Sequence, residues 1–268
     1  MTHPFEIALD TVLPAGPEQV WEAIATGPGV DSWFMGRNTV DPREGGTAAM
    51  TTAGHRQEAV VTAWEPAKRL ATRTPETGDG RFMAFEYLIE GREGAATVLR
   101  VVHSGVLGDD WQEEYDALRR GWPFHLHTLH EYLAHFAHRT AVPVFAAAPA
   151  PGRTPQEIRA LLAGALGLPL PVTEGARARA DVPGLPPLQG HVVWADDERI
   201  AVRGTDALHT FHHGPGLVLL FHHLFHPTAD GPATDGPATT GADAGTEIGT
   251  EADRADAAWQ QWLTRLLA

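Results

Sequence analysis

Apolar and polar residues alternate along much of the first half of the chain. In residues 5–13, Phe5, Ile7 and Leu9 fall on one side of an extended segment and polar residues fall on the other. Four more strand-like runs, each bounded by Gly, Pro or charged residues, lie at residues 57–66, 69–75, 81–91 and 96–105. The intervals between these runs are too short for crossover helices, so we expect an antiparallel sheet.

Helical patterns flank this predicted sheet. Residues 14–34 indicate a turn, a helix with Pro17 at its first position, a second turn and a short helix. A longer helix is predicted from about residue 123 to residue 138. Its apolar residues follow four-three spacing, which places on one stripe Trp122, Leu126, Leu129, Leu133 and Phe136.

The composition changes after residue 140, which divides the chain into a first domain (1–140) and a second. Residues 141–155 are rich in Ala and Pro and predict a linker. Residues 156–268 predict a small α+β domain, with a helix near its start, two hairpins and a short amphipathic helix at its end. Within it, residues 228–256 are acidic and of low complexity, so we expect them to be disordered.

The order of elements in the first half, together with five segments, resembles a known family. The segments are PAGPEQVWEAIATGPGVDSWF (14–34), DPREGG (41–46), AVVTAWEPAKRL (59–70), GAATVLRVVHSG (94–105) and GWPFHLHTLHEYL (121–133). Over residues 5–140 the chain resembles the helix-grip fold of the START-like (SRPBCC) superfamily, in the branch named for the activator of the heat-shock chaperone ATPase. The resemblance implies an α+β fold in which an antiparallel sheet wraps a long C-terminal helix. The second domain is then either a separate small α+β domain or a shortened, diverged copy of the same fold.

In a helix-grip fold the curved sheet and the last helix enclose a cavity, and strand alternation selects the residues that would line it. Tyr87 and His103 are the polar candidates on otherwise apolar strand faces. The full set of candidate ligand-binding residues is Trp33, Phe34, His55, Arg73, Phe85, Tyr87, His103, Trp122, Leu126, Leu129 and Leu133. Each has a simpler interpretation as a core residue or, for Arg73, as the partner of a surface acid.

Histidines are concentrated in two places. Residues 121–138 hold five, and His127, Glu131 and His135 share the four-residue spacing of ligands on one side of a helix. We favour the simpler interpretation, in which these residues form the polar face of an amphipathic helix. Residues 207–227 place further histidines on strands, where zinc or nickel shared across a hairpin is the alternative to ordinary packing. We expect no metal and no cofactor.

Composition narrows the classes of partner. The chain has 268 residues and a formal net charge of −14, so nucleic acid and anionic membranes are disfavoured. It has no cysteine, which removes disulfides and thiolate chemistry. The N-terminal residues lack the pattern of a signal peptide, and no apolar run reaches the length of a membrane span, so we expect a cytoplasmic protein.

Three functions remain open. The first is non-enzymatic binding of a small hydrophobic or amphipathic molecule in the cavity, which is the function we favour. The second is an enzyme similar to polyketide cyclases, dehydratases or hydrolases, in which cavity His and Tyr groups move protons; its catalytic residues are unknown. The third is a co-chaperone-like or regulatory module that binds another protein, which an exposed apolar patch would favour.

Overall fold

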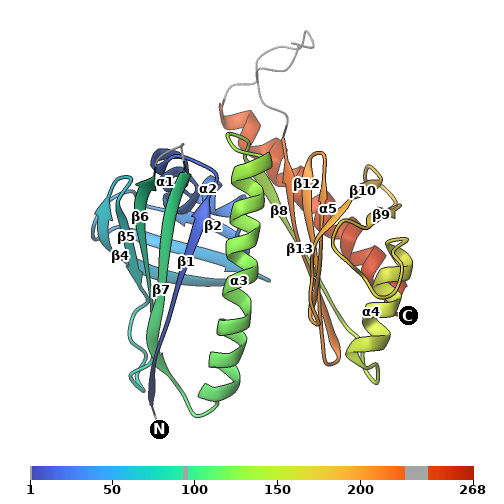
Figure 1. Cartoon of the computed structure of the whole chain (residues 1–268), viewed down its shortest axis with the longest axis horizontal. Coiled ribbons are helices and arrows are strands. Elements are labelled where there is room, and N and C mark those ends of the chain that lie inside the picture. Colours follow the sequence, from blue (N-terminus) through green and yellow to red (C-terminus); the bar gives the residue numbers. More distant parts are fainter. Residues whose placement is uncertain (1, 93–95, 227–240) are drawn as a thin grey trace. The chain divides into compact units, whose positions relative to one another are not determined.

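Seven strands of the first half form one antiparallel sheet in the computed structural model of the protein. They are β1 (His3–Leu13), β2 (Arg37–Val40), β3 (Thr47–Thr52), β4 (His55–Glu65), β5 (Arg69–Arg73), β6 (Phe82–Arg92) and β7 (Ala96–Leu107). Their spatial order is β1-β7-β6-β5-β4-β3-β2 (Figure 1). The structure describes residues 2–92, 96–226 and 241–268, with only the backbone for 241–250.

The chain divides into two compact units, residues 1–140 and 141–268. Each unit has one antiparallel sheet and a long helix that follows the last strand of that sheet (Figure 1). This is the predicted α+β class, and the first unit has the predicted helix-grip arrangement.

The first and last strands of the first unit pair with each other at one edge of its sheet. β1 and β7 are antiparallel along their full length, from His3 opposite Leu107 to Leu13 opposite Thr97. The inner side of β1 is half-buried or buried at Phe5, Ile7 and Leu9, while the intervening residues are exposed, as the alternation predicts.

Two short helices follow β1 and form a corner over the inner face of the sheet. They are α1 (Pro17–Ala25), which begins with the predicted proline, and α2 (Gly27–Asp31). Trp33 lies two residues after the end of α2, and its indole Nε1–H donates to the carbonyl of Ala23 at 2.9 Å. This buried bond fixes the chain where it leaves the corner and enters β2.

The long helix α3 (Trp111–His135) begins twelve residues before the predicted start. Pro123 does not open the helix but lies inside it. The preceding residues QEEYDALRR are good helix formers with acidic residues in the first turn, and they extend the helix toward β7. The predicted apolar stripe of α3 is buried.

The second unit repeats the connectivity of the first. Its elements are β8 (Ala141–Pro149), α4 (Pro155–Ala165), β9 (Arg177–Ala180), β10 (Leu188–Ala195), β11 (Arg199–Gly204), β12 (Ala207–Gly214), β13 (Leu217–Phe225) and α5 (Gly241–Leu267). The strand order is β8-β13-β12-β11-β10-β9, so the first strand again pairs with the last strand before the closing helix. Of the two interpretations, this order favours a shortened copy of the helix grip, with six strands in the sheet of the described residues instead of seven.

Two sequence predictions for the second unit are wrong. Residues 141–149 are not a linker but the strand β8, because alternate residues such as Val142, Val144 and Ala146 enter a core. Residues 241–256 of the predicted disordered segment belong to α5. The part of that prediction that concerns residues 228–240 lies outside the described residues.

Strand β8 is at the edge of its sheet, and side chains of α5 satisfy its outer backbone groups. Asp256 accepts from the backbone N–H of Phe145 at 2.8 Å. Gln260 accepts from the N–H of Ala147 at 3.1 Å and donates to the carbonyl of the same residue at 2.8 Å. Side chains one helical turn apart thus replace a neighbouring strand and leave less of the edge open to pairing with another chain.

No helix within the described residues is both long and apolar enough to cross a membrane.

The contact between α5 and β8 predicts a specific loss of stability. Replacing Asp256 with Ala removes a charged acceptor from the Phe145 N–H, and we expect the free energy of unfolding to fall by about 1–3 kcal/mol in urea denaturation. The control is Asp253→Ala, because Asp253 is exposed on the same helix. Equal stability of the two variants would show that the edge contact contributes nothing.

Candidate functional site

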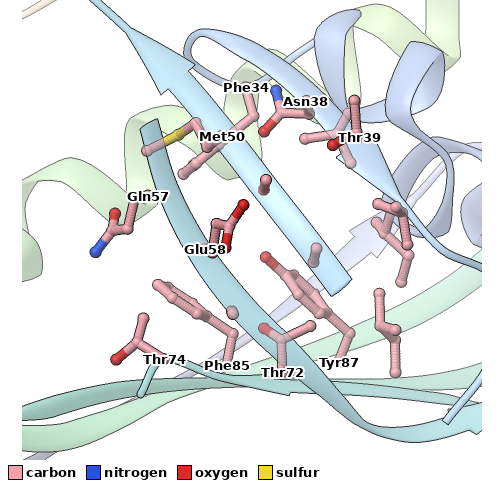
Figure 2. Close-up of a pocket in the computed structure, with 17 residues that line it drawn as sticks. Phe34, Asn38, Thr39, Met50, Gln57, Glu58, Thr72, Thr74, Phe85 and Tyr87 are labelled. Atoms are coloured by element: carbon pink, nitrogen blue, oxygen red, sulfur yellow. The ribbon is translucent and has the colours of Figure 1, made fainter. Parts of the chain in front are cut away.

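A cavity of about 140 Å³ lies between the α1–α2 corner and strands β2 to β6 of the first unit. Figure 2 shows its aromatic and polar lining, with the Tyr87 hydroxyl pointing toward the middle of the space. The lining residues are Ile24, Val30, Phe34, Asn38, Thr39, Val40, Ala48, Ala49, Met50, Gln57, Glu58, Ala59, Leu70, Thr72, Thr74, Phe85 and Tyr87. No residue of α3 is among them, so the predicted cavity between sheet and C-terminal helix is displaced toward the corner.

Aromatic rings occupy the space under α3 and account for this displacement. The Phe34 ring stacks on Trp122 at 6.1 Å between centroids, and the Phe85 ring stacks on His103 at 4.1 Å. The indole Nε1–H of Trp122 donates to His103 Nδ1 at 3.0 Å. Phe34 and Phe85 therefore face the cavity, while Trp122 and His103 lie behind them.

His103 serves as a neutral hydrogen-bond acceptor. Because Nδ1 accepts from Trp122, the ring proton of the neutral imidazole is on Nε2, which is buried without a partner among the described residues. Burial lowers the pKa of His103 to about 4. His103 thus holds Trp122 in place and does not reach the cavity.

The polar groups of the cavity lie on the strands. Burial raises the pKa of Tyr87 above its usual range, so its hydroxyl is uncharged at neutral pH. Thr39, Gln57 and Glu58 are exposed, which places the open side of the cavity over β2 and β4. The Glu58 carboxylate also accepts from Arg56 Nε at 2.8 Å.

Asp31 connects the corner to the cavity wall. Its Oδ1 accepts from the backbone N–H of Asn38 at 2.7 Å and from Asn38 Nδ2 at 3.0 Å. Burial raises the pKa of Asp31 to about 6, although the bonds from Asn38 act in the opposite direction. This pair positions Asn38, which lines the cavity.

The structure places the predicted site residues in three groups. Phe34, Phe85 and Tyr87 line the cavity. Behind the lining, and buried, are Trp33, His103, Trp122, Leu126, Leu129 and Leu133. His55 and Arg73 are exposed and away from the cavity.

Arg73, one of the candidates selected from the sequence, is exposed on β5 and is not among the lining residues. It follows Thr72 on β5, and neighbouring residues of a strand point to opposite faces. Thr72 takes the cavity side, while Arg73 pairs with Glu76 at 3.4 Å and lies over the Phe82 ring at 3.9 Å. This placement favours the simpler interpretation of Arg73 as the partner of a surface acid.

Sequence reasoning missed the polar lining contributed by β2 and β4. Asn38, Thr39 and Gln57 are not on clearly amphipathic strands, so alternation does not select them. Strand pairing brings them together: Asn38 is opposite Met50, which is in turn opposite Gln57. The one signal in the sequence that could have indicated these lining residues is that their strands directly follow the α1–α2 corner along the chain.

The histidines of the second unit meet across a hairpin. His209 on β12 is opposite His222 on β13, with ring centroids 4.7 Å apart. Within the described residues, no three His, Asp or Glu side chains are grouped as metal ligands would be. His209 and His213 are buried and His212 is half-buried, although burial does not alternate over residues 207–211.

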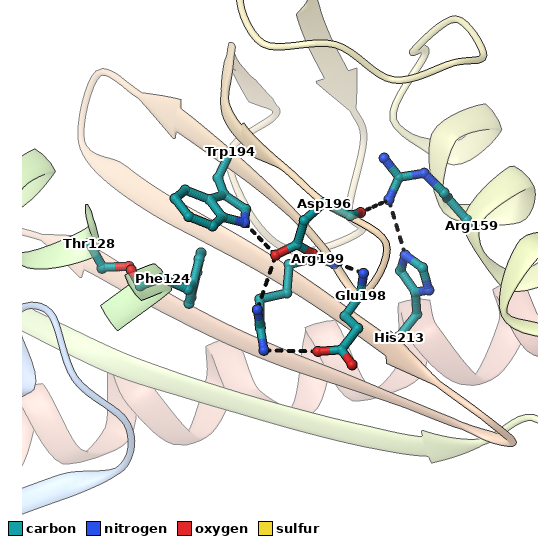
Figure 3. Close-up of polar contacts among 8 residues, drawn as sticks. All are labelled: Phe124, Thr128, Arg159, Trp194, Asp196, Glu198, Arg199 and His213. Atoms are coloured by element: carbon teal, nitrogen blue, oxygen red, sulfur yellow. Dashed lines mark hydrogen bonds and ion pairs between the residues drawn. The ribbon is translucent and has the colours of Figure 1, made fainter. Parts of the chain in front are cut away.

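A polar network closes the turn between β10 and β11 (Figure 3). Asp196 accepts from the Trp194 indole N–H at 2.7 Å and from the Arg199 guanidinium at 3.0 Å, and Arg199 also donates to Glu198 at 3.0 Å. The Asp196 carboxylate further accepts from the backbone N–H groups of residues 198 and 199. These bonds fix a hairpin turn and leave Arg199 nearly buried, so we interpret the network as structural.

Residues 14–134 match the family model described as Activator of Hsp90 ATPase homolog 1-like protein. The match lies within the first unit and confirms the resemblance identified from the sequence. Among curated proteins, none matches the chain.

Several solved structures are similar to about half of the chain. Protein MLL2253 from Mesorhizobium loti is 21% identical over 49% of this chain and 98% of its own, with a TM-score of 0.44. CalU16 from Micromonospora echinospora is 23% identical over 47% of this chain and 73% of its own, with a TM-score of 0.39. The chain in the structure of the Aha1 dimer from Colwellia psychrerythraea is 22% identical over 48% of this chain and 96% of its own, with a TM-score of 0.41.

Because His103 is held in its neutral state, we predict that the free energy of unfolding decreases as the pH is lowered. An unfolded chain binds a proton at histidine near pH 6.5, whereas the folded state resists protonation until about pH 4. Stability from His103 is therefore complete above pH 6.5 and is lost as pH falls toward 4. We therefore compare the free energy of unfolding at about pH 7 and about pH 5 by urea denaturation. Over this interval it should decrease by about 2 kcal/mol more in the wild type than in His103→Phe.

The control for this measurement is Phe85→Leu, which disturbs the ring that stacks on His103 without removing a titratable group. This variant should be less stable than the wild type by a similar amount at both pH values. A wild type and His103→Phe with the same pH dependence would contradict the role assigned to His103.

Proposed function

We propose that the first unit binds a small, mainly apolar molecule in the cavity between the α1–α2 corner and the sheet, without chemical conversion. The observation that carries this proposal is an apolar space with a neutral hydroxyl group at its centre and an open side over β2 and β4. Apolar walls with a few placed polar groups are typical of ligand sites.

The volume limits the size of the ligand. Drug-sized ligands occupy pockets of roughly 300–1,000 Å³, whereas an apolar cavity of about 150 Å³ holds benzene. The cavity of about 140 Å³ therefore suits one ring or a short aliphatic chain, or the end of a longer molecule that leaves through the open side.

The arrangement of His103 and Tyr87 favours binding over catalysis. Proton transfer on one substrate requires both groups to reach it. His103 lies behind the Phe85 ring and is committed to Trp122, and burial raises the pKa of Tyr87 so that it does not act as a base at neutral pH. Tyr87 is better suited to donate a hydrogen bond to a bound molecule.

Exposed apolar residues give little support to a protein-docking role for the sheet. In the described part of the first unit, the large apolar residues that are strongly exposed are Val12 (54%) and Val60 (45%). They lie on β1 and β4, which three other strands separate in the sheet. These side chains do not form the contiguous patch that an apolar interface requires.

Benzene is the probe for the apolar walls. We expect benzene to shift the methyl resonances of Ala48, Ala49, Met50 and Leu70 in a methyl-labelled full-length protein, because these groups line the cavity. Ala49→Leu adds three carbon atoms to the space and should weaken benzene binding at least tenfold. Ala8→Leu is the control, since Ala8 is exposed on β1. Unchanged binding in Ala49→Leu would refute this site.

Phenol tests the hydroxyl of Tyr87 separately. Loss of one hydrogen bond between neutral groups corresponds to about 1 kcal/mol, so Tyr87→Phe should weaken phenol binding about fivefold and leave benzene binding unchanged. The matched control is Tyr115→Phe, because Tyr115 packs against Phe5 and does not line the cavity. Equal loss for phenol and benzene would assign Tyr87 a purely structural role.

A further inference from the structure

Three arginines of the second unit lie on the face of its sheet that is opposite the core. Arg177 and Arg179 are on β9, the edge strand, and Arg203 is on β11, two strands further in. Residues 141–268 contain eight arginines and no lysine, so three of these eight side chains gather at one place. These three residues are called the arginine cluster below.

Strand alternation and register explain how the arginine cluster forms. Arg177 and Arg179 alternate with two alanines that are buried in the core of the unit, so both arginines point to the opposite face. His191 of β10 is opposite Arg177 on one side and opposite Arg203 on the other. Because directly opposite residues share a face, these three side chains form one row across three strands.

The arginine cluster lines an open cavity of about 560 Å³, a volume within the range of small-molecule sites. Every polar side chain of its lining can donate a hydrogen bond; these side chains belong to Arg177, Arg179, Gln189, His191, Arg203 and Thr205. The other lining residues are Ala178, Gly190 and Gly204, so none of the nine described residues of the lining is acidic. The acids nearest to them in the sequence, Glu174, Asp181 and Asp206, lie outside the lining.

Two of the three guanidinium groups have no partner among the residues that the structure describes. No hydrogen bond or ion pair there involves the side chain of Arg177 or that of Arg179. Each of these side chains has a full positive charge and five N–H donors. Neighbouring strands lie about 4.8 Å apart, and alternate residues of a strand lie about 7 Å apart, so the charges of the cluster repel one another. An anion in the cavity would offset this repulsion.

Protection of the sheet edge is the simpler explanation for charged residues on β9. It does not account for Arg203, which is half-buried and two strands away from the edge. The edge is also already covered at one point, because the backbone N–H of Arg179 donates to the carbonyl of Leu166 at 2.8 Å. A binding role accounts for all three arginines.

The positive charges of the cluster select the kind of anion. A carboxylate has one negative charge and two oxygens, whereas a phosphate monoester has about 1.5 to 2 negative charges near neutral pH and three acceptor oxygens. The fork of an arginine matches two phosphate oxygens, so several arginines can bind one phosphate group. Nucleic acid also supplies phosphates, but the formal net charge of −14 repels a long polyanion. A small molecule avoids most of this repulsion.

We propose that the arginine cluster binds the phosphate group of a small phosphate monoester. Arg177 and Arg179 hold the phosphate oxygens, and Arg203 adds a third positive charge. Gln189 and His191 donate from the strand between them. The volume of about 560 Å³ leaves room for the organic part of the molecule. This site is formed by the second unit alone and is independent of the binding site proposed in the first.

The test titrates the ¹⁵N-labelled full chain with glucose 6-phosphate and follows the arginine Nε–H resonances by NMR near pH 6.5. We expect the Nε–H resonances of Arg177 and Arg179 to shift until they saturate, because a phosphate oxygen accepts from each guanidinium. Glucose should leave both resonances in place, and gluconate, which has one carboxylate, should bind at least tenfold more weakly. Resonances that stay in place at millimolar glucose 6-phosphate, or that respond equally to gluconate, would overturn the proposal.

Matched variants test whether the site or the net charge binds the phosphate. Arg177→Gln and Arg179→Gln change exposed residues, and each should weaken binding of glucose 6-phosphate at least tenfold. The control is Arg265→Gln, since Arg265 is exposed on α5 and does not line the cavity; it should change the affinity less than twofold. The shifts in the wild type do not depend on the folding of any variant.

Two further results would contradict the proposal. An equal loss of affinity in all three variants would mean that the net charge alone attracts the phosphate. Tighter binding of a single-stranded oligonucleotide than of glucose 6-phosphate, at the same two arginine resonances, would assign this face to nucleic acid.

Discussion

The pairing of the first strand with the last strand organises both units. In the first unit, the eleven-residue pairing of β1 with β7 brings together segments about ninety residues apart in sequence. In the second, β8 pairs with β13 in the same way. Because the first strand occupies one edge, the remaining strands extend the sheet on the other side of the last strand. The end of the last strand in turn determines where the long helix that follows it can begin. The corner helices and the cavities take their positions from this constraint.

Aromatic packing then decides how much of the enclosed space remains open. In the first unit the bond from Trp122 to His103 anchors two rings, on which Phe34 and Phe85 stack. These rings fill the region under α3 and leave space only near the corner. The small size of the cavity is therefore a consequence of how α3 is attached to β7, and a change at His103 would alter the wall as well as stability.

The sequence was sufficient to predict the order of the main elements and the inner faces of the strands, because alternation and turn residues are local signals. It was insufficient where a long-range contact decides. Ala141–Pro149 resembles a linker by composition and becomes a strand because β13 and α5 provide partners. His103 shares a face with cavity residues, but which of several inward residues meets open space depends on the rings packed between them. The strand register that links Asn38 through Met50 to Gln57 leaves no local trace in the sequence.

The two units differ in how histidine and tryptophan side chains pack between the sheet and the long helix. Under α3, the inward histidine has an indole partner on the helix, and the pair is sealed behind phenyl rings. Under α5, the cross-strand histidines His209 and His222 also face an indole, that of Trp259, but among the described residues its N–H bonds to neither ring. A histidine that accepts from an indole on the helix stabilises the fold directly. A histidine and an indole that remain buried and unpaired cost stability, so the same residue types contribute in opposite directions in the two units.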